Sequence, residues 1–244
     1  MTGVQTCALP IWEFSIEHFH DSKVFETLIP KICKIFREEN EELTGFENEE
    51  ILAEYQIYKT PGYVYMKGNV QIYSAGKQAA DISAFPEGIA VAVGSEEDVP
   101  DICPDQTIDK VFTIENLTSF YRFKQEHSLV IYLGGYHNHS RRNLLMQIYQ
   151  KLPDAQYYHF GDLDAGGFYI LEHLKRKTGI PFQMFQMDIE TLKKYEDYAK
   201  PLTENDKKRL MQLEKMELPD EERKLITYML QKGIKLEQEC ISES

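Results

Sequence analysis

Residues 161–167 read Gly-Asp-Leu-Asp-Ala-Gly-Gly and directly follow an apolar run, Gln-Tyr-Tyr-His-Phe, at 156–160. A second apolar run, Val-Phe-Thr-Ile, ends immediately before Glu115. Short apolar runs of this kind predict buried strands, so each strand places carboxylates at its C-terminal end. Because parallel strands share one crevice at these ends, we expect Glu115, Asp162 and Asp164 to converge there. Three carboxylates repel one another unless a cation joins them, and oxygen ligands suit Mg²⁺.

The spacing of the two aspartates carries its own information. In an extended segment Asp162 and Asp164 point to the same side, while Leu163 turns the other way into the core. Both carboxylates can then bind one metal or two neighbouring metals. Gly166 and Gly167 follow, and such small residues allow a sharp turn and the close approach of a phosphate to a helix N-terminus. The alternative is that the aspartates only cap the next helix.

The order of these motifs resembles a known family. Glu115, followed by a strand, a helix and the 161–167 segment, resembles the Toprim domain of topoisomerases, bacterial primases and several nucleases. More closely, the chain is similar to the C-terminal domain of JetD, the nuclease subunit of the Wadjet plasmid-defence system, itself related to the topoisomerase VI A subunit. The segments that carry this similarity are 113–120, 132–136 and 158–168, with looser matches at 21–23, 61–64, 67–68 and 236–239.

The resemblance implies a DNA endonuclease that hydrolyses phosphodiesters with water and Mg²⁺, with Mn²⁺ as an alternative metal. On the matching positions, Glu115, Asp162 and Asp164 are the implied catalytic and metal-binding residues. Glu115 is either a metal ligand or the general acid/base, and the sequence does not separate these roles. The implied partners are DNA and SMC-like complex subunits, and a homodimer stays open. JetD-like proteins carry a further N-terminal region with a winged-helix part, so we expect this chain to be a C-terminal fragment.

A second group of residues is placed to contact phosphate or DNA beside the carboxylates. The histidines of this group follow a predicted strand end, and its arginines form a local basic pair in an acidic chain. Asn116 has an equally good interpretation as part of a strand-end turn, and each histidine as an ordinary loop residue. His159, inside a strand, is interpreted as a packed, hydrogen-bonded histidine. The candidate contacts are Asn116, His137, His139, Arg141, Arg142, Gly166 and Gly167.

Net charge is the main argument against a DNA enzyme. The 244 residues carry a net charge of −13, which lacks the basic footprint that usually supplies affinity for nucleic acid. If DNA is the substrate, much of the binding energy must come from an N-terminal region, partner subunits or bound metal. The four cysteines are scattered and indicate neither a zinc site nor a disulfide framework. No apolar stretch approaches 18 residues, so we expect no membrane segment and a cytoplasmic protein.

Two other functional classes stay open. The first is a phosphatase of the haloacid-dehalogenase type, whose first strand also bears an Asp-x-Asp motif. Such enzymes usually continue with Thr or Val where this chain has Gly166, which argues against them. The second is a catalytically idle scaffold of a DNA complex, in which the acidic edge holds only a structural ion.

The periodicity of the chain predicts an α/β fold with a parallel, Rossmann-like sheet and helices on both faces, and the resemblance implies that this sheet is of the Toprim type. We expect four domains or segments in order, and the connection at 94–110 is the boundary before the main domain. After Asp188 the pattern is wholly helical. The segments are 1–11, a non-native sequence resembling translated sequencing adapter; 12–109, an N-terminal helix and β-hairpin region; 110–188, the Toprim core; and 189–244, a C-terminal helical extension. The expected strands are 110–114, 129–133, 156–161 and 182–187, and the expected helices are 117–126, 140–151 and 167–177.

The N-terminal region contains a strong helical pattern and a weaker strand pattern. Residues 22–39 place apolar side chains along one stripe, which predicts an amphipathic helix. Strands at 63–66 and 70–73, joined at Lys67-Gly68-Asn69, predict a hairpin. Residues 1–11 are expected to pack poorly, because nothing selected them to fit the rest of the protein.

Overall fold

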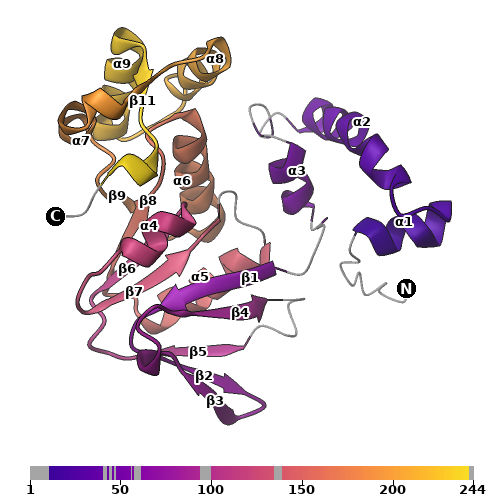
Figure 1. The fold of residues 1–244 in the computed structure, drawn as a ribbon, viewed down its shortest axis with the longest axis vertical. Helices are drawn as coiled ribbons and strands as arrows, with labels where there is room; N and C mark the ends of the chain where they lie inside the picture. The colour runs from indigo at the N-terminus through magenta and orange to yellow at the C-terminus, as the bar shows by residue number, and fades with distance from the viewer. Residues whose placement is uncertain are drawn as a thin grey trace.

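β-Branched and aromatic residues build the central strands of the main sheet. The computed structural model describes residues 11–40, 43, 46, 48–55, 57, 62–93, 100–134 and 139–241. Strand β6 (Lys110–Ile114) lies between β7 (Ser128–Tyr132) and β8 (Gln156–Phe160), and both pairings are parallel. The short β9 (Gln183–Met184) extends the parallel part beyond β8. The parallel strands therefore open their C-terminal ends onto one edge, as predicted (Figure 1).

The other two strands of this six-stranded sheet come from the N-terminal half. Strand β1 (Gly62–Lys67) pairs antiparallel with both β7 and β4 (Ile89–Val93). The predicted hairpin is wrong, because β2 (Val70–Ser74) pairs with β3 (Lys77–Asp81) and β5 (Asp101–Pro104) in a separate sheet. Residues 62–93 therefore belong partly to the same sheet as the core at 110–188.

Gly68 is the point at which the chain leaves one sheet for the other. Its φ of 138° lies in a region that side chains rarely adopt. A Cβ atom at Gly68 would also lie 2.6 Å from the carbonyl oxygen of Ser128. The glycine thus permits a close crossing over β7, where the sequence suggested a local turn.

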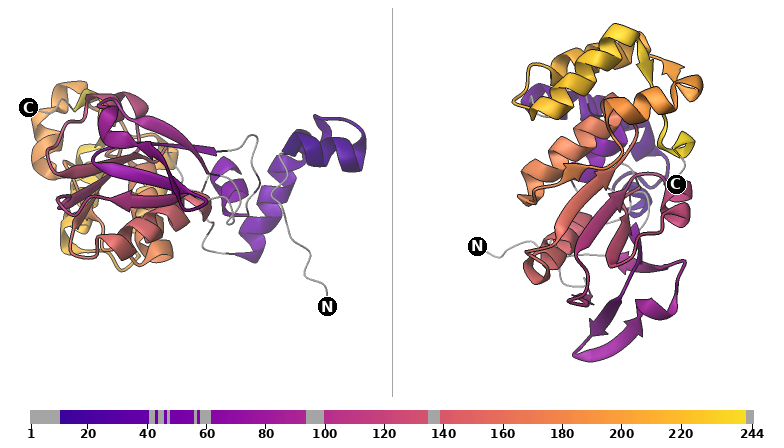
Figure 2. Two further views of the ribbon diagram at one scale, coloured as in Figure 1. Left: turned by 90° about the horizontal axis from the view of Figure 1, so that it is seen from below. Right: turned by 90° about the vertical axis from the view of Figure 1, so that its left-hand side faces the viewer.

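Helices cover both faces of the main sheet, in agreement with the predicted α/β fold (Figure 2). Alternate residues of β6 face opposite sides: Val111 packs in one apolar cluster and Phe112 in the other. The first cluster also holds Leu144 and Ile148 of helix α5 (His139–Lys151). The other holds residues from α4 (Leu117–Arg122), α8 (Glu204–Leu213) and α9 (Asp220–Lys232). Helix α6 (Ala165–Thr178) contributes to both clusters.

The C-terminal extension is mainly helical, but it is not wholly so. Helix α7 (Ile189–Lys194) and the 3₁₀ turn η4 (Glu196–Tyr198) are followed by two-residue strands, β10 (Lys200–Pro201) and β11 (Ile234–Lys235). These strands pair antiparallel and bring the chain after α9 back toward the main sheet. The prediction of an exclusively helical extension is therefore wrong, because pairs this short leave no periodic pattern. A last 3₁₀ turn, η5 (Gln238–Cys240), lies beside α4.

Three helices precede the sheet and lie to one side of it (Figure 1). They are α1 (Ile11–Phe19), α2 (Val24–Glu39) and α3 (Asn48–Glu54), and α2 confirms the predicted amphipathic helix. Ile11 is only 2% exposed, so the expectation that residues 1–11 pack poorly is wrong at this position. Ile11 lies one helical turn before the buried Ser15 and shares its face. Residues 1–10 lie outside the described part of the chain.

No helix in the described part of the chain is both long enough and apolar enough to span a membrane.

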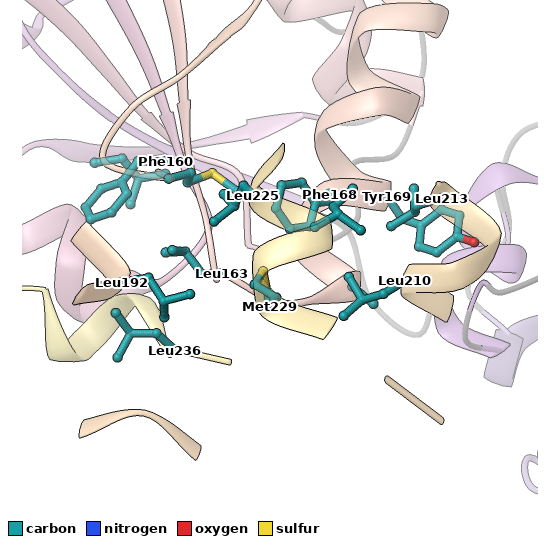
Figure 3. Packing of buried hydrophobic residues seen from close by; sticks show 14 of the residues in the cluster. Phe160, Leu163, Phe168, Tyr169, Leu192, Leu210, Leu213, Leu225, Met229 and Leu236 are labelled. Atoms are coloured by element: carbon teal, nitrogen blue, oxygen red, sulfur yellow. The ribbon is translucent and has the colours of Figure 1, made fainter. Parts of the chain in front are cut away.

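Leu163, between the two aspartates, is completely buried, as the alternation predicted. Its backbone exchanges hydrogen bonds of 2.9 and 3.2 Å with Leu236, which closes an isolated β-bridge. Figure 3 shows its side chain within the apolar cluster formed by the sheet and the C-terminal helices. The labelled members of the cluster around it include Phe160, Leu192, Met229 and Leu236.

We expect Leu163→Ala to lower the free energy of unfolding by about 2–5 kcal/mol, because a buried leucine is replaced by a cavity. Urea denaturation followed by circular dichroism measures the loss. Met211, 52% exposed on α8, provides a control, since Met211→Ala removes little buried surface. A Leu163→Ala variant as stable as the wild type would contradict the packing described above.

Candidate metal centre

Glu115 and Asp162 meet at the C-terminal edge of the main sheet. Glu115 directly follows β6, and its N–H donates to the carbonyl oxygen of Phe160 at 3.1 Å. Asp162 follows β8, and its N–H lies 3.3 Å from Oε2 of Glu115. Because β6 and β8 are adjacent parallel strands, the two acidic residues are neighbours although they are far apart in the sequence. The two residues are therefore adjacent through the backbone of Asp162, whereas the convergence of their carboxylates on a metal stays a prediction.

The electrostatic environment of Asp162 is unfavourable to its charge. Burial is the main effect and raises the pKa of the Asp162 carboxyl to about 6, with the nearby Asp164, Glu239 and Glu237 acting in the same direction. The N–H of Gln238 donates to Asp162 Oδ1 at 2.7 Å and partly opposes this rise. A cation bound here would relieve both the desolvation and the repulsion.

Asp164 has a structural role that the sequence left open. Its Oδ1 accepts a 2.9 Å hydrogen bond from the N–H of Gly167 and caps helix α6. A Cβ atom at Gly167 would lie 2.2 Å from the carbonyl oxygen of Asp162, so a glycine is required for this tight turn. At Gly166 the nearest atom to such a Cβ is Asp164 Oδ1, at 3.1 Å. The Gly167 N–H is thus used by the cap, whereas phosphate contact by Gly166 stays a prediction.

The expected group of three convergent carboxylates is not fully formed. Among the described residues, no three His, Cys, Asp or Glu side chains are arranged to hold a metal ion by themselves. Mg²⁺, however, usually retains several waters and binds through only one or two carboxylates together with substrate phosphates. Glu115 and Asp162 supply oxygen donors of this kind, and Asp164 keeps a second carboxylate oxygen beyond the one in the cap. The donor chemistry fits Mg²⁺ with water ligands better than it fits a closed protein cage.

The C-terminal strap, residues 236–241, crosses the ends of β6 and β8. Gln238 is fully buried: its Nε2 donates to the carbonyl oxygen of Phe160 at 3.0 Å, and its Oε1 accepts from the N–H of Asn116 at 2.8 Å. Asn116 Nδ2 also donates to Glu239. Sequence reasoning missed the role of Gln238, although its segment matched the JetD family. The strap thereby brings Glu237 and Glu239 close to Asp162.

Asn116 is explained mainly by the local turn. Its side-chain oxygen accepts hydrogen bonds from Thr118 N–H at 2.7 Å and Ser119 N–H at 3.1 Å, which caps helix α4. This agrees with the strand-end alternative considered for this residue. A direct contact of Asn116 with DNA stays a prediction.

The basic candidates are divided between surface and core. Arg142 is only 6% exposed and forms a 2.7 Å ion pair with Glu54 of α3, which is a structural role. Arg141 Nη2 lies 3.4 Å from the carbonyl oxygen of Tyr63 and is the better placed of the two to contact phosphate. His139 begins α5, but its side chain is outside the described part of the chain, as is the whole of His137.

His159 lies directly behind the acidic edge. The residue is fully buried, and its Nδ1 is 3.0 Å from the hydroxyl of Thr113. Burial is the main cause that lowers the pKa of His159 to about 3, and Lys175 adds a smaller effect, so the ring is neutral. This agrees with the interpretation of His159 as a packed, hydrogen-bonded histidine.

Comparison with known proteins shows to which family the chain belongs. The profile of the family described as "Wadjet protein JetD, C-terminal" matches residues 97–244, which include the whole acidic edge. The chain belongs to the JetD C-terminal family. The JetD match covers β6, β8 and the C-terminal strap, and so includes Glu115, Asp162 and Gln238.

A full-length JetD relative also matches. The chain is 29% identical over 239 residues to the Wadjet protein JetD of Bacillus cereus (strain Q1). The aligned region covers 96% of this chain and 58% of the relative. The chain therefore spans a little over half the length of that JetD protein.

Proposed function

We propose that this chain is the catalytic part of a JetD-like DNA endonuclease, with a Toprim-type site that depends on Mg²⁺, or alternatively Mn²⁺. The observation that carries the proposal is the position of Glu115 beside the half-buried Asp162 at the C-terminal edge of the sheet, where Glu115 Oε2 lies 3.3 Å from the Asp162 N–H. Membership of the JetD family supports it, since the matched region contains both residues. By the same resemblance, the partners are DNA and SMC-like subunits of a Wadjet complex.

The chain's own residues have distinct parts in this proposal. Asp162 and Glu115 hold the metal, and Asp164 contributes through the carboxylate oxygen that the helix cap does not use. When bound, the metal neutralises the scissile phosphate and stabilises the leaving oxygen. Glu115 is also placed to orient water or to exchange a proton with it. Gln238 fixes the orientation of Asp162 through its backbone N–H.

The net charge of −13 limits the affinity of the chain for DNA. Few phosphates are neutralised by such an acidic surface, so the fragment alone is expected to bind DNA weakly. Fluorescence anisotropy with a labelled duplex should give a weak affinity for the 244-residue chain alone. Tight binding by this chain without partner subunits would contradict this expectation.

The decisive test is plasmid nicking by the full-length protein assembled with its partner subunits. We expect nicking with Mg²⁺ or Mn²⁺, none in EDTA, and none for Asp162→Ala. Asp154→Ala, at the opposite end of β8 and exposed, should nick at the wild-type rate. Release of phosphate from small monoesters without nicking would indicate a phosphatase.

One observation favours a second candidate, a catalytically idle scaffold. Asp164 caps α6 and Asp162 accepts from Gln238, so both aspartates already have structural partners. An idle scaffold predicts an intact complex that does not nick under any metal condition. Size-exclusion chromatography of the assembly beside the nicking assay separates the two candidates.

A further inference from the structure

One buried polar atom next to the acidic edge has no partner. Nε2 of His159 is completely enclosed and makes no hydrogen bond to the described residues. Leaving a buried nitrogen without a hydrogen bond is energetically unfavourable, so such an atom calls for an explanation. The other ring nitrogen, Nδ1, contacts the Thr113 hydroxyl and holds the ring in place.

Gly161 explains where this nitrogen points. A Cβ atom at Gly161 would lie 2.8 Å from His159 Nε2 and 2.7 Å from Glu115 Oε2. Both atoms therefore approach the same point beside the Gly161 α-carbon. The φ of Gly161 is not in the left-handed region, so the backbone does not demand a glycine. A glycine is needed because the His159 imidazole and the Glu115 carboxylate leave no room for a Cβ atom.

Hydrogen-bond chemistry then selects the tautomer of the ring. The Thr113 hydroxyl has a single proton, which can go to the Tyr158 carbonyl at 3.2 Å or to His159 Nδ1 at 3.0 Å. If it goes to Nδ1, the ring proton sits on Nε2 and faces the Glu115 carboxylate. If it goes to Tyr158, a bare Nε2 lone pair faces that carboxylate, which is electrostatically unfavourable.

We propose that His159 is a positioning residue, which donates Nε2–H to the Glu115 carboxylate. The two side chains meet beside Gly161, where no Cβ atom separates them. The imidazole is fixed by burial and by Thr113, whereas the Glu115 side chain is only partly buried, so a small rotation of Glu115 closes the bond. The bond selects one orientation of Glu115 relative to Asp162. Its consequence for cleavage rests on the nuclease function proposed above.

The tautomer is measured without reference to activity. Long-range ¹H–¹⁵N correlation spectra of the metal-free 244-residue chain should show His159 protonated at Nε2. Glu115→Ala removes the acceptor and should shift the ring toward the Nδ1–H form, whereas Glu126→Ala, on an exposed turn, should not. Protonation at Nδ1 in the wild type would overturn the proposal.

The positioning role is then tested by nicking in the assembled full-length protein. His159→Phe removes the donor and should lower the rate about 10- to 100-fold, the usual effect of losing a residue that orients a metal ligand. His159→Gln offers an amide N–H near the position of Nε2 and should restore most of the rate. Gly161→Ala inserts a methyl group between the two partners and should match His159→Phe.

Thermal melting shows which variants are folded, and Gly161→Ala keeps the test valid if His159→Phe does not fold. Equal rates for folded Phe and Gln variants, or a wild-type rate for Gly161→Ala, would overturn the positioning role. Failure of the proposed nuclease function would give a different result. The wild type would not nick with any metal, but His159 would still carry its proton on Nε2 and would still change tautomer in Glu115→Ala.

Discussion

Asp162→Asn is expected to abolish nicking and, at the same time, to make the metal-free protein more stable at neutral pH. Asparagine keeps a side-chain oxygen to accept the N–H of Gln238, which lies 2.7 Å from Asp162 Oδ1. It removes only the buried negative charge, together with its repulsion by Asp164, Glu237 and Glu239. If removing the charge of Asp162 stabilises the fold, that charge serves the proposed metal binding and not the stability of the protein.

The pH dependence of this effect has a definite sign. Burial raises the pKa of Asp162 from an unfolded value of 3.8 to about 6 in the folded protein. Stability associated with the protonated carboxyl is present below pH 3.8 and is lost as the pH rises through 6. The advantage of Asp162→Asn should therefore be absent near pH 4 and reach about 1–3 kcal/mol at pH 8.

Urea denaturation in EDTA at several pH values measures this difference. Asp154→Asn, an exposed change at the far end of β8, is the matched control and should have no such pH dependence. Added Mg²⁺ should stabilise the wild type but not Asp162→Asn, because only a folded state that binds the ion gains from it. Equal stability of the two proteins at pH 8 would show that Asp162 is not electrostatically strained.

The sequence predicted the centre of the fold well, because its signals there are local. Runs such as 110–114 and 156–160 have no competing pattern, and the strands β6 and β8 lie at these positions. The hairpin at 63–73 failed because Lys67-Gly68-Asn69 looks like a turn in isolation. Pairing of β1 with β7, far along the chain, decides the structure there, and no local pattern encodes it.

The site shows the same division between local and distant information. Glu115 and Asp162 were predictable because each follows its own strand, and the capping role of Asp164 was a recognised alternative. Gln238 was not predictable as a site residue, since it reaches the strand ends only after the C-terminal helices return the chain. The approach of His159 and Glu115 to each other beside Gly161 was equally hidden, because Gly161 could be explained as an ordinary loop glycine.

Glu54→Gln should lower the free energy of unfolding by about 3–5 kcal/mol, the usual effect of breaking a buried ion pair. Glu54, 16% exposed, accepts from Arg142 of α5 at 2.7 Å and pairs with Lys177 of α6 at 3.1 Å. His173, also on α6, lies 3.5 Å from the same carboxylate. The N-terminal helix α3 is thus tied to two helices of the main α/β unit, beside which it lies in Figure 1.

The charge state of Glu54 gives this effect a pH window. Burial alone would raise its pKa, but His173, Arg142 and Lys177 together hold it far below the usual value. The resulting stability is present above the unfolded pKa of 4.5 and is lost as the pH falls toward the lower folded value. The difference between wild type and Glu54→Gln should therefore be largest near pH 7 and shrink progressively below pH 4.5.

A surface pair and a double variant complete this experiment. Glu38, 63% exposed, pairs with Lys34 at 3.7 Å, and Glu38→Gln should change the unfolding free energy by less than about 1 kcal/mol. Arg142→Met should also destabilise the protein when made alone, because it removes the most deeply buried cation that pairs with Glu54. Combined with Glu54→Gln it should cost less than the two single changes added together, since the buried Arg142–Glu54 pair is then removed as a whole and only the partly exposed Lys177 loses a partner. Strict additivity would mean that Glu54 and Arg142 stabilise the protein independently, and that the ion pair does not join α3 to α5.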